Sequence, residues 1–419
     1  MSTDGLRATS PWPAEDAGPT RQAAPRKATW TGVTSRTTLN VTSREALVGT
    51  MVVLGGEGQA YLLRHTGPPD AVAVVEQFDP VTLETIGTSP ELPGGPVWPG
   101  GMAVLGSGDL VVIFGNHAHR LSPDLSVLAA RTLPRNRPYN SFVTLECGLI
   151  ATKDFTGPFS GADPADDRPS ELLLLDPATL EVVSALELPE PSVARLSAIG
   201  DEIVVVGVES IFSVDVVDGA LVERTGGHRY RTEPGQGYGW DAVIDGDIAY
   251  FLDDGEGSEA FDGSFEGRGT ATAPLRLHRV DRATGTATSV AICGRAGGLI
   301  ANPPALDPSR RIVVGFDSGN KVVAAFGADD LAPRWTASLG HGSHPLVLPD
   351  SGEVVMADFD RARGTEQIVV LDIETGEERG RVDTGSPVQS VVFPAVGFDR
   401  DLYWVSFFML SRISASDEG

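Results

Sequence analysis

From residue 51 onward, short runs of Val, Ile and Leu alternate with turn residues, and no convincing amphipathic helix interrupts them. One pattern recurs: a strand, then Asp-x-x-Thr followed by Gly or Leu, then a second strand. It occurs at residues 172–186, 277–291 and 368–382, with a fourth copy at 76–87. The Asp carboxylate can accept hydrogen bonds from N–H groups of the turn, and Gly supplies a positive φ. Each copy is therefore predicted to be a β-hairpin.

The hairpins recur at nearly regular intervals. Weaker copies occur at 119–131, 212–224 and 324–335, so that equivalent turn positions lie 39 to 66 residues apart. A four-stranded propeller blade takes roughly 40–50 residues, so the longer intervals imply insertions. Two more strands precede most of the hairpins, at 141–155, 195–208, 241–254 and 346–359. Each unit is thus predicted to contain four strands, named a to d in chain order.

This repeat predicts an all-β chain folded as one β-propeller. Seven complete blades fit between residues 51 and 386, and residues 388–416 supply most of another. Residues 37–43 could donate its missing outer strand, which would close the ring across the termini and remove the open sheet edges. We expect eight four-stranded blades, with seven as the alternative. The propeller domain spans 31–419, and residues 1–30, rich in Pro, Ala, Ser and charge, are predicted to be a disordered tail.

The repeats VLDIETGEERGRV and RVDRATGTATSVA resemble those of the PQQ-like, or quinoprotein-dehydrogenase-like, propeller superfamily. The resemblance covers most of residues 51–416 and is specific to the repeat. It implies a propeller that is either a quinone-dependent dehydrogenase or a cofactor-free assembly scaffold. The tryptophan that often ends such a repeat is mostly missing, and only Trp335 lies near that place. The adjacent cysteine pair of the alcohol dehydrogenases is also absent, because Cys147 and Cys293 lie far apart. Both departures, with the lack of an export signal, count against a quinone enzyme.

The net charge, the apolar runs and the number of cysteines indicate which partners and which cellular compartment to expect. The net charge of −25 disfavours nucleic acid and anionic membrane surfaces. No run of eighteen apolar residues suggests a membrane span, and the N-terminus has no apolar signal-peptide core. Two cysteines, with no CxxC motif, fit a reducing compartment. We expect a cytoplasmic, acidic protein whose partner is a small molecule, with its oligomeric state left open.

The connections between strands differ on the two faces of the predicted propeller. The a–b and c–d turns are short, whereas the connections of the other face are long at 154–170, 226–239 and 253–273. Long loops on one face of a rigid scaffold usually carry function. Polar residues gather at the strand ends of that same face, around the predicted mouth of the central channel. They suit a hard cation or a polar ligand.

We therefore expect an enzyme of hydrolase or lyase type that acts on a small polar or carboxylated molecule at this mouth. The expected catalytic residues are Asp154, Asp241 and His344. The expected substrate-binding residues are Asn140, Tyr139, Trp240, Asn302, His117, Lys153 and Arg137. Asn140 and the three catalytic candidates should converge within about 10 Å of a common point, close enough to share one small ligand.

Several features of this hypothesis stay open. A divalent cation is a possible cofactor, without assigned metal ligands. Two alternatives compete with the enzyme: a non-catalytic binding or scaffold propeller, and a quinone-dependent dehydrogenase in which Trp240 would stack on the cofactor. Each candidate residue also has an ordinary structural role, since an Asp after a strand usually caps a turn. The substrate and the reaction type do not follow from the sequence.

Overall fold

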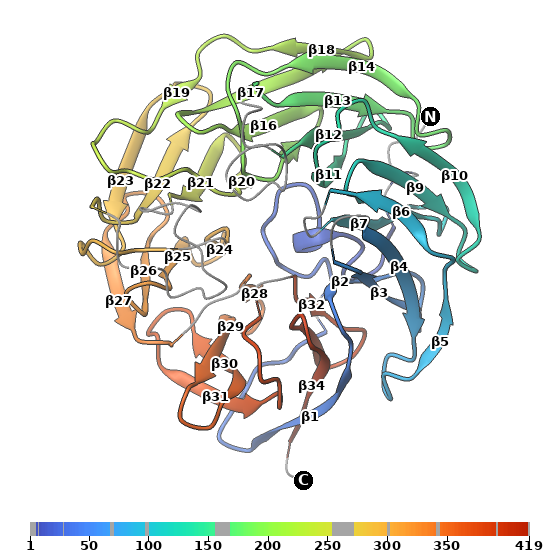
Figure 1. Cartoon of the computed structure of the whole chain (residues 1–419). Coiled ribbons are helices and arrows are strands. Elements are labelled where there is room, and N and C mark those ends of the chain that lie inside the picture. The colour runs from blue at the N-terminus through green and yellow to red at the C-terminus, as the bar shows by residue number, and fades with distance from the viewer. Residues whose placement is uncertain are drawn as a thin grey trace.

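Eight four-stranded antiparallel sheets form a closed ring around a central channel (Figure 1). The structure is a computed structural model, and it describes residues 6, 8–27, 29–67, 71–96, 100–155, 168–253, 272–299, 302–340, 344–390 and 393–417. The only helical element among these residues is the short 3-10 helix η2 (Glu15–Ala17). The predicted all-β propeller of eight blades is confirmed, and seven blades are excluded.

The first four blades follow the chain from the inside of the ring outward. Blade 1 contains β2 (Gly49–Leu54), β3 (Ala60–His65), β4 (Ala71–Phe78) and β5 (Thr85–Thr88), and β6 (Leu92–Gly95) also pairs with β4. Blade 2 contains β7 (Gly101–Val104), β8 (Leu110–Phe114), β9 (His117–Leu121) and β10 (Val127–Thr132). Blade 3 contains β11 (Tyr139–Thr144), β12 (Ile150–Asp154), β13 (Glu171–Leu175) and β14 (Val182–Glu187). Blade 4 contains β15 (Ser197–Ile199), β16 (Glu202–Val206), β17 (Ser210–Val217) and β18 (Ala220–Glu223), and β19 (His228–Arg229) pairs with β17.

The remaining blades complete the ring. Blade 5 contains β20 (Val243–Asp245), β21 (Ile248–Leu252), β22 (Arg276–Asp281) and β23 (Ala287–Ala291). Blade 6 contains β24 (Ala305–Asp307), β25 (Ile312–Asp317), β26 (Val322–Gly327) and β27 (Pro333–Ala337). Blade 7 contains β28 (Leu346–Leu348), β29 (Glu353–Asp360), β30 (Thr365–Asp372) and β31 (Glu378–Asp383). Blade 8 contains β32 (Ala395–Val396), β33 (Asp401–Val405), β34 (Met409–Asp417) and the N-terminal strand β1 (Thr37–Glu45).

The repeated Asp shapes the c–d turn in the way that its position predicted. In blade 3, Asp176 Oδ1 accepts hydrogen bonds from the N–H groups of Ala178 at 2.9 Å and Thr179 at 2.8 Å. Asp372 makes the same two contacts in blade 7. The residue after the Thr has a positive φ, 75° at Gly376 and 59° at Leu180. Leu180 is buried, so its packing offsets the strain of a left-handed backbone.

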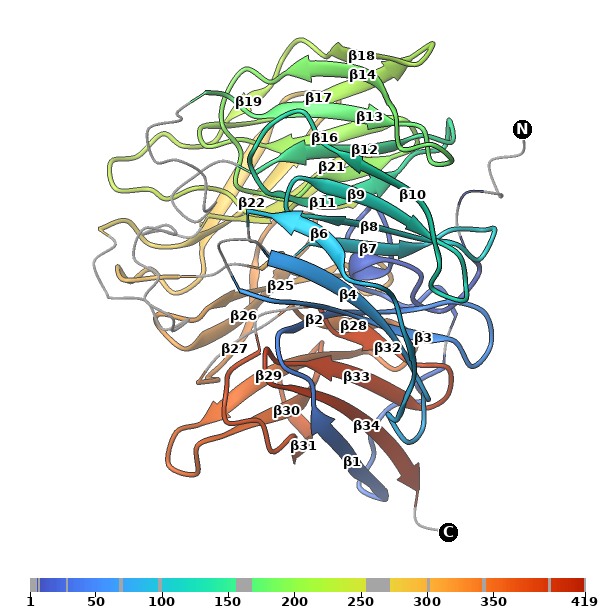
Figure 2. The ribbon, with the colours of Figure 1, turned by 45° about the vertical axis from the view of Figure 1, so that its right-hand side comes forward.

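The two ends of the chain close the ring together. β1 pairs with β34 along its whole length, from Thr37 opposite Asp417 to Glu45 opposite Met409. The composite blade predicted from residues 37–43 is therefore confirmed. Figure 2 shows β1 and β34 side by side at the bottom of the molecule. Ser43 Oγ also donates a hydrogen bond at 2.8 Å to the carbonyl of Thr384, in the neighbouring blade.

Burial follows the position of each strand in its blade. All residues of β2 and β8 are buried, because they pack between neighbouring blades, whereas the outer strand β10 is largely exposed. No helix in the described part of the chain is long and apolar enough to cross a membrane. The loop predicted at 226–239 contains the short strand β19. Residues 156–167 and 254–271, which make up most of the other two predicted loops, lie outside the described residues.

The N-terminal segment, residues 8–27, lies across the channel at the end where the a–b turns emerge. Its carbonyls accept hydrogen bonds from inner-strand N–H groups of five blades. These bonds are Leu54 to Trp12 (2.8 Å), Val104 to Pro13 (2.8 Å), Ala198 to Pro19 (2.7 Å), Ile244 to Thr20 (2.9 Å) and Val347 to Ala23 (2.9 Å). This differs from the disordered tail that composition predicted. The inner strands leave backbone groups unpaired at the channel, and the segment satisfies them.

Candidate functional site

The N-terminal segment brings charged side chains into the channel. η2 carries Glu15 and Asp16, and Arg21 follows it; all three are buried. The Arg21 guanidinium contacts Glu15 and lies 3.0 Å from Asp16 Oδ2. It also donates hydrogen bonds to Ser141 Oγ at 2.8 Å and to the carbonyl of Leu196 at 2.6 Å. These residues were not among the predicted site residues, because the composition of residues 1–30 predicted disorder.

Two of the predicted catalytic residues join this cluster. Asp241, just before β20, accepts a hydrogen bond from the Arg195 N–H at 2.6 Å and lies 3.2 Å from Arg195 Nη1. Arg195 Nε lies 3.2 Å from Glu15 Oε1. His344 Nδ1 lies 3.2 Å from Asp16 Oδ1. The structure therefore links Asp241 and His344, as predicted, but through residues of the N-terminal segment. We call these five residues, together with Arg21, the channel cluster.

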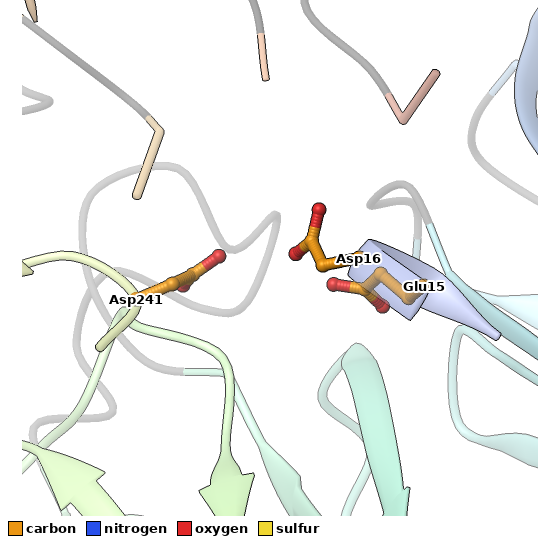
Figure 3. A group of neighbouring side chains, drawn as sticks. All are labelled: Glu15, Asp16 and Asp241. Atoms are coloured by element: carbon orange, nitrogen blue, oxygen red, sulfur yellow. The ribbon is translucent and has the colours of Figure 1, made fainter. Parts of the chain in front are cut away.

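The channel cluster contains a group of oxygens that resembles a cation site. Figure 3 shows Glu15, Asp16 and Asp241 directed toward one another, and one carboxylate oxygen of each lies within 4.8 Å of the others. Such oxygens suit a hard cation. Each carboxylate is, however, already paired with Arg21 or Arg195. These guanidinium groups supply the positive charge that the three carboxylates require.

The pKa values of Glu15 and Asp16 shift in opposite directions. Burial raises the pKa of Glu15 more than the nearby guanidinium groups lower it. For Asp16, burial acts in the same direction, but His344 and the arginines outweigh it and lower its pKa. Folding therefore favours the ionised form of Asp16 and the protonated form of Glu15.

The third predicted catalytic residue, Asp154, belongs to a separate ion pair at the end of β12. It is buried, and its Oδ2 lies 2.9 Å from Arg137 Nη1 and 3.4 Å from Arg135 Nη1. Its Oδ1 accepts a hydrogen bond from the N–H of Glu171, which begins the next strand. Asp154 therefore fastens the connection between β12 and β13. The predicted ligand-binding Arg137 is committed to this pair.

Two further predicted ligand-binding residues, Lys153 and Trp240, are also buried. Lys153 is buried and donates a hydrogen bond to the carbonyl of Ser192 at 3.1 Å. Burial lowers its pKa to about 7, against the opposing effect of Asp154 and Asp241. Trp240 is buried in an apolar cluster with Phe155 and Val193. Its indole N–H has no hydrogen-bond partner among the described residues.

The other predicted ligand-binding residues do not meet at the channel cluster. Tyr139 is buried opposite Asp154 in the sheet, and burial raises the pKa of its phenol. His117 begins β9, the third strand of its blade, and its Nδ1 lies 3.0 Å from the carbonyl of Gly94. Asn302 is buried, and the side chain of Asn140 lies outside the described part of the structure. Among the predicted site residues, direct contacts join Asp241 and His344 to the channel cluster, and Lys153 lies close enough for the charges of Asp241 and Arg21 to affect its pKa.

One buried acid, Glu366, was not predicted from the sequence. Glu366, the second residue of β30, accepts hydrogen bonds from the Ser390 N–H at 2.7 Å and from Thr384 Oγ1 at 3.3 Å. Burial raises its pKa to about 7. The sequence pattern of β30 contains a signal for this position, because Glu366 is a charged residue at the start of a run of buried residues.

The sequence matches no family model and no curated protein. Solved structures are similar in fold. BamB from Moraxella catarrhalis aligns at 12% identity over 90% of this chain and 100% of that chain, with a TM-score of 0.58. Quinohemoprotein alcohol dehydrogenase ADHIIG from Pseudomonas putida HK5 aligns at 10% identity over 98% and 81%, with a TM-score of 0.65. The quinohemoprotein alcohol dehydrogenase from Comamonas testosteroni gives 10%, the same coverage and 0.64.

Among the described residues, the candidate for stacking on a quinone cofactor does not fit that role. This candidate, Trp240, packs against Phe155 and Val193. The buried Arg137 and Arg195 are paired with Asp154 and Asp241. The likeness to these structures is therefore one of architecture. By its eight four-stranded blades and its solved neighbours, this chain shares the β-propeller fold of BamB and of these quinohemoprotein alcohol dehydrogenases.

Proposed function

We propose that this chain is a non-catalytic binding propeller, and that the charges in its channel fix the N-terminal segment rather than act on a substrate. One observation carries the proposal. Asp154 and Asp241 are both buried, and each accepts a hydrogen bond from a backbone N–H and pairs with a guanidinium group. A general base must reach the proton of a substrate, and these carboxylates are committed elsewhere.

The competing functions have weaker support. The hydrolase or lyase hypothesis rests on residue types at strand ends, and most of those residues have structural partners. The quinone-dependent dehydrogenase is favoured by two similar structures that are named quinohemoprotein alcohol dehydrogenases. The packing of Trp240 disfavours it. A binding propeller needs neither a cofactor nor a free carboxylate, and it would use the face that carries the long connections.

Among the described residues, an exposed part of that face lies around β19. Arg229 is 69% exposed and pairs with Glu209, and Arg231 lies over the ring of Tyr238 at 5.1 Å. Arg and Tyr are common anchors of binding interfaces because they combine apolar area with hydrogen-bonding groups. We place the partner of the proposed binding function on this face.

The variant Asp241→Asn tests whether the carboxylate of Asp241 has a structural or a catalytic role. Asn keeps the shape but removes the charge, so that buried Arg195 loses one of its two carboxylate partners. Breaking a buried ion pair costs about 3–5 kcal/mol, and we expect the free energy of unfolding to fall by about that amount. Urea denaturation measures it. The matched control is Asp247→Asn, because Asp247 is exposed in the a–b turn of the same blade.

Two outcomes would overturn the proposal. The first is an Asp241→Asn protein that is as stable as the unmodified chain, because catalytic groups are often neutral or costly for stability. The second is a metal ion bound in a one-to-one ratio in the purified protein and lost in the Asp241→Asn variant. Either result would restore the enzyme as the first hypothesis.

A further inference from the structure

A groove lies at the opposite end of the propeller from the long connections, where blades 1 and 8 meet. Its volume is about 570 Å³. Three parts of the chain line it: the N-terminal segment, the a–b and c–d turns of blade 1, and the a–b turn of blade 8. We call it the seam groove. Small-molecule sites usually occupy roughly 300–1,000 Å³, so the seam groove has room for a molecule much larger than an ion.

The walls of the seam groove are fastened to one another. Tyr403 donates a hydrogen bond at 2.7 Å to the carbonyl of Pro80, which joins blade 8 to blade 1. Ser10 donates one at 2.5 Å to the carbonyl of Leu54, which joins the N-terminal segment to blade 1. Asp401 is paired with Arg412. The groove is therefore formed before a ligand arrives, which reduces the entropy that binding must overcome.

Unpaired charges of both signs line this rigid groove. Lys27 lies on the N-terminal wall, whereas Glu57 and Asp399 lie on the walls from blades 1 and 8. All three are exposed, and no described residue forms an ion pair with them. Phe398 and Val81 line the same groove and supply apolar surface. A complementary ligand carries an ammonium group, a carboxylate and an apolar body.

We propose that the seam groove binds short peptides with free termini and an apolar side chain. Asp399 and Glu57 receive the terminal ammonium group, Lys27 receives the terminal carboxylate, and Phe398 contacts the apolar side chain. Charge-assisted hydrogen bonds of this kind give both affinity and orientation. This inference does not depend on the proposed binding function, because that function uses the other face of the propeller.

Calorimetric titration of the full chain with the dipeptide leucyl-phenylalanine tests the proposal. We expect saturable binding to the unmodified protein. The N-acetylated and the C-terminally amidated dipeptides should each bind roughly tenfold more weakly, because each lacks one charged contact. Lys27→Met should weaken the unblocked dipeptide by a similar factor and leave the amidated form unchanged. Asp399→Asn should weaken binding of the unblocked dipeptide by a similar factor and leave binding of the acetylated form unchanged.

The control variant is Asp350→Asn, which removes an exposed carboxylate outside the groove and should leave the titration unchanged. Lys27 and Asp399 are exposed, so both variants are expected to melt at the temperature of the unmodified protein, and this is measured first. Absence of saturable binding at millimolar dipeptide would overturn the proposal. So would binding that both variants leave unchanged, because the dipeptide would then lie elsewhere.

Discussion

Arg21→Met tests whether the N-terminal segment is part of the folded channel. The Arg21 side chain is 1% exposed and contacts Glu15, Asp16, Ser141 and the carbonyl of Leu196. Methionine keeps much of the side-chain length and removes the charge, which leaves two buried carboxylates without this partner. Breaking a buried pair in this way costs about 3–5 kcal/mol. We expect the free energy of unfolding to fall by that amount at pH 7.

Urea denaturation, followed by tryptophan fluorescence, measures the loss. Lys27→Met is the matched control, because Lys27 is an exposed cation of the same segment and its replacement should change stability by less than about 0.5 kcal/mol. Adding Glu15→Gln to Arg21→Met should recover part of the loss, since one of the unpaired charges is removed. If Arg21→Met unfolds at the same urea concentration as the unmodified chain, the segment is not held in the channel, and the disordered tail predicted from composition would be correct.

Two other changes test neighbouring parts of the structure. Deleting residues 1–30 should lower the melting temperature, because five blades lose backbone partners. Deleting residues 1–45 should lower it further, because β1 is also removed. A protein without residues 1–30 that melts at the temperature of the full chain would contradict this. Glu366→Gln tests the buried acid, whose pKa rises from 4.5 to about 7 on folding. Because the folded state holds this proton more tightly, the contribution of Glu366 is complete below pH 4.5 and is lost as the pH rises to about 7. The Gln variant should therefore gain up to about 3 kcal/mol over the unmodified chain between these values, and a difference in unfolding free energy that does not change with pH would refute the assignment.

The blades could be predicted from the sequence because their determinants are local. Asp176 and Asp372 each accept hydrogen bonds from the N–H groups two and three residues later, so these contacts can be predicted from the sequence of the hairpin alone. The outer strand β1 could also be predicted, because an incomplete last blade requires one more strand. These features depend on short spacings or on counting strands.

The candidate site was less predictable, because its partners are far apart in the chain. The sequence places Asp241 at a strand end, and this is its position in the structure. It does not show that Arg195 and Glu15 surround it. The composition of residues 1–30 predicts disorder, since Pro, Ala and charged residues rarely form a core on their own. Trp12 and Arg21 become ordered only because the ring provides a surface for them.

The long reach of the N-terminal segment has a consequence for how the chain is made. Asp16 and its partner His344 lie 328 residues apart in the sequence. During synthesis the N-terminal segment leaves the ribosome first, whereas the blades that hold it emerge one after another. Each hairpin can form from contacts within its own blade, but the segment and β1 must wait for blades 7 and 8. Residues 8–27 are thus translated before the blades that hold them, and are among the last to reach their native positions.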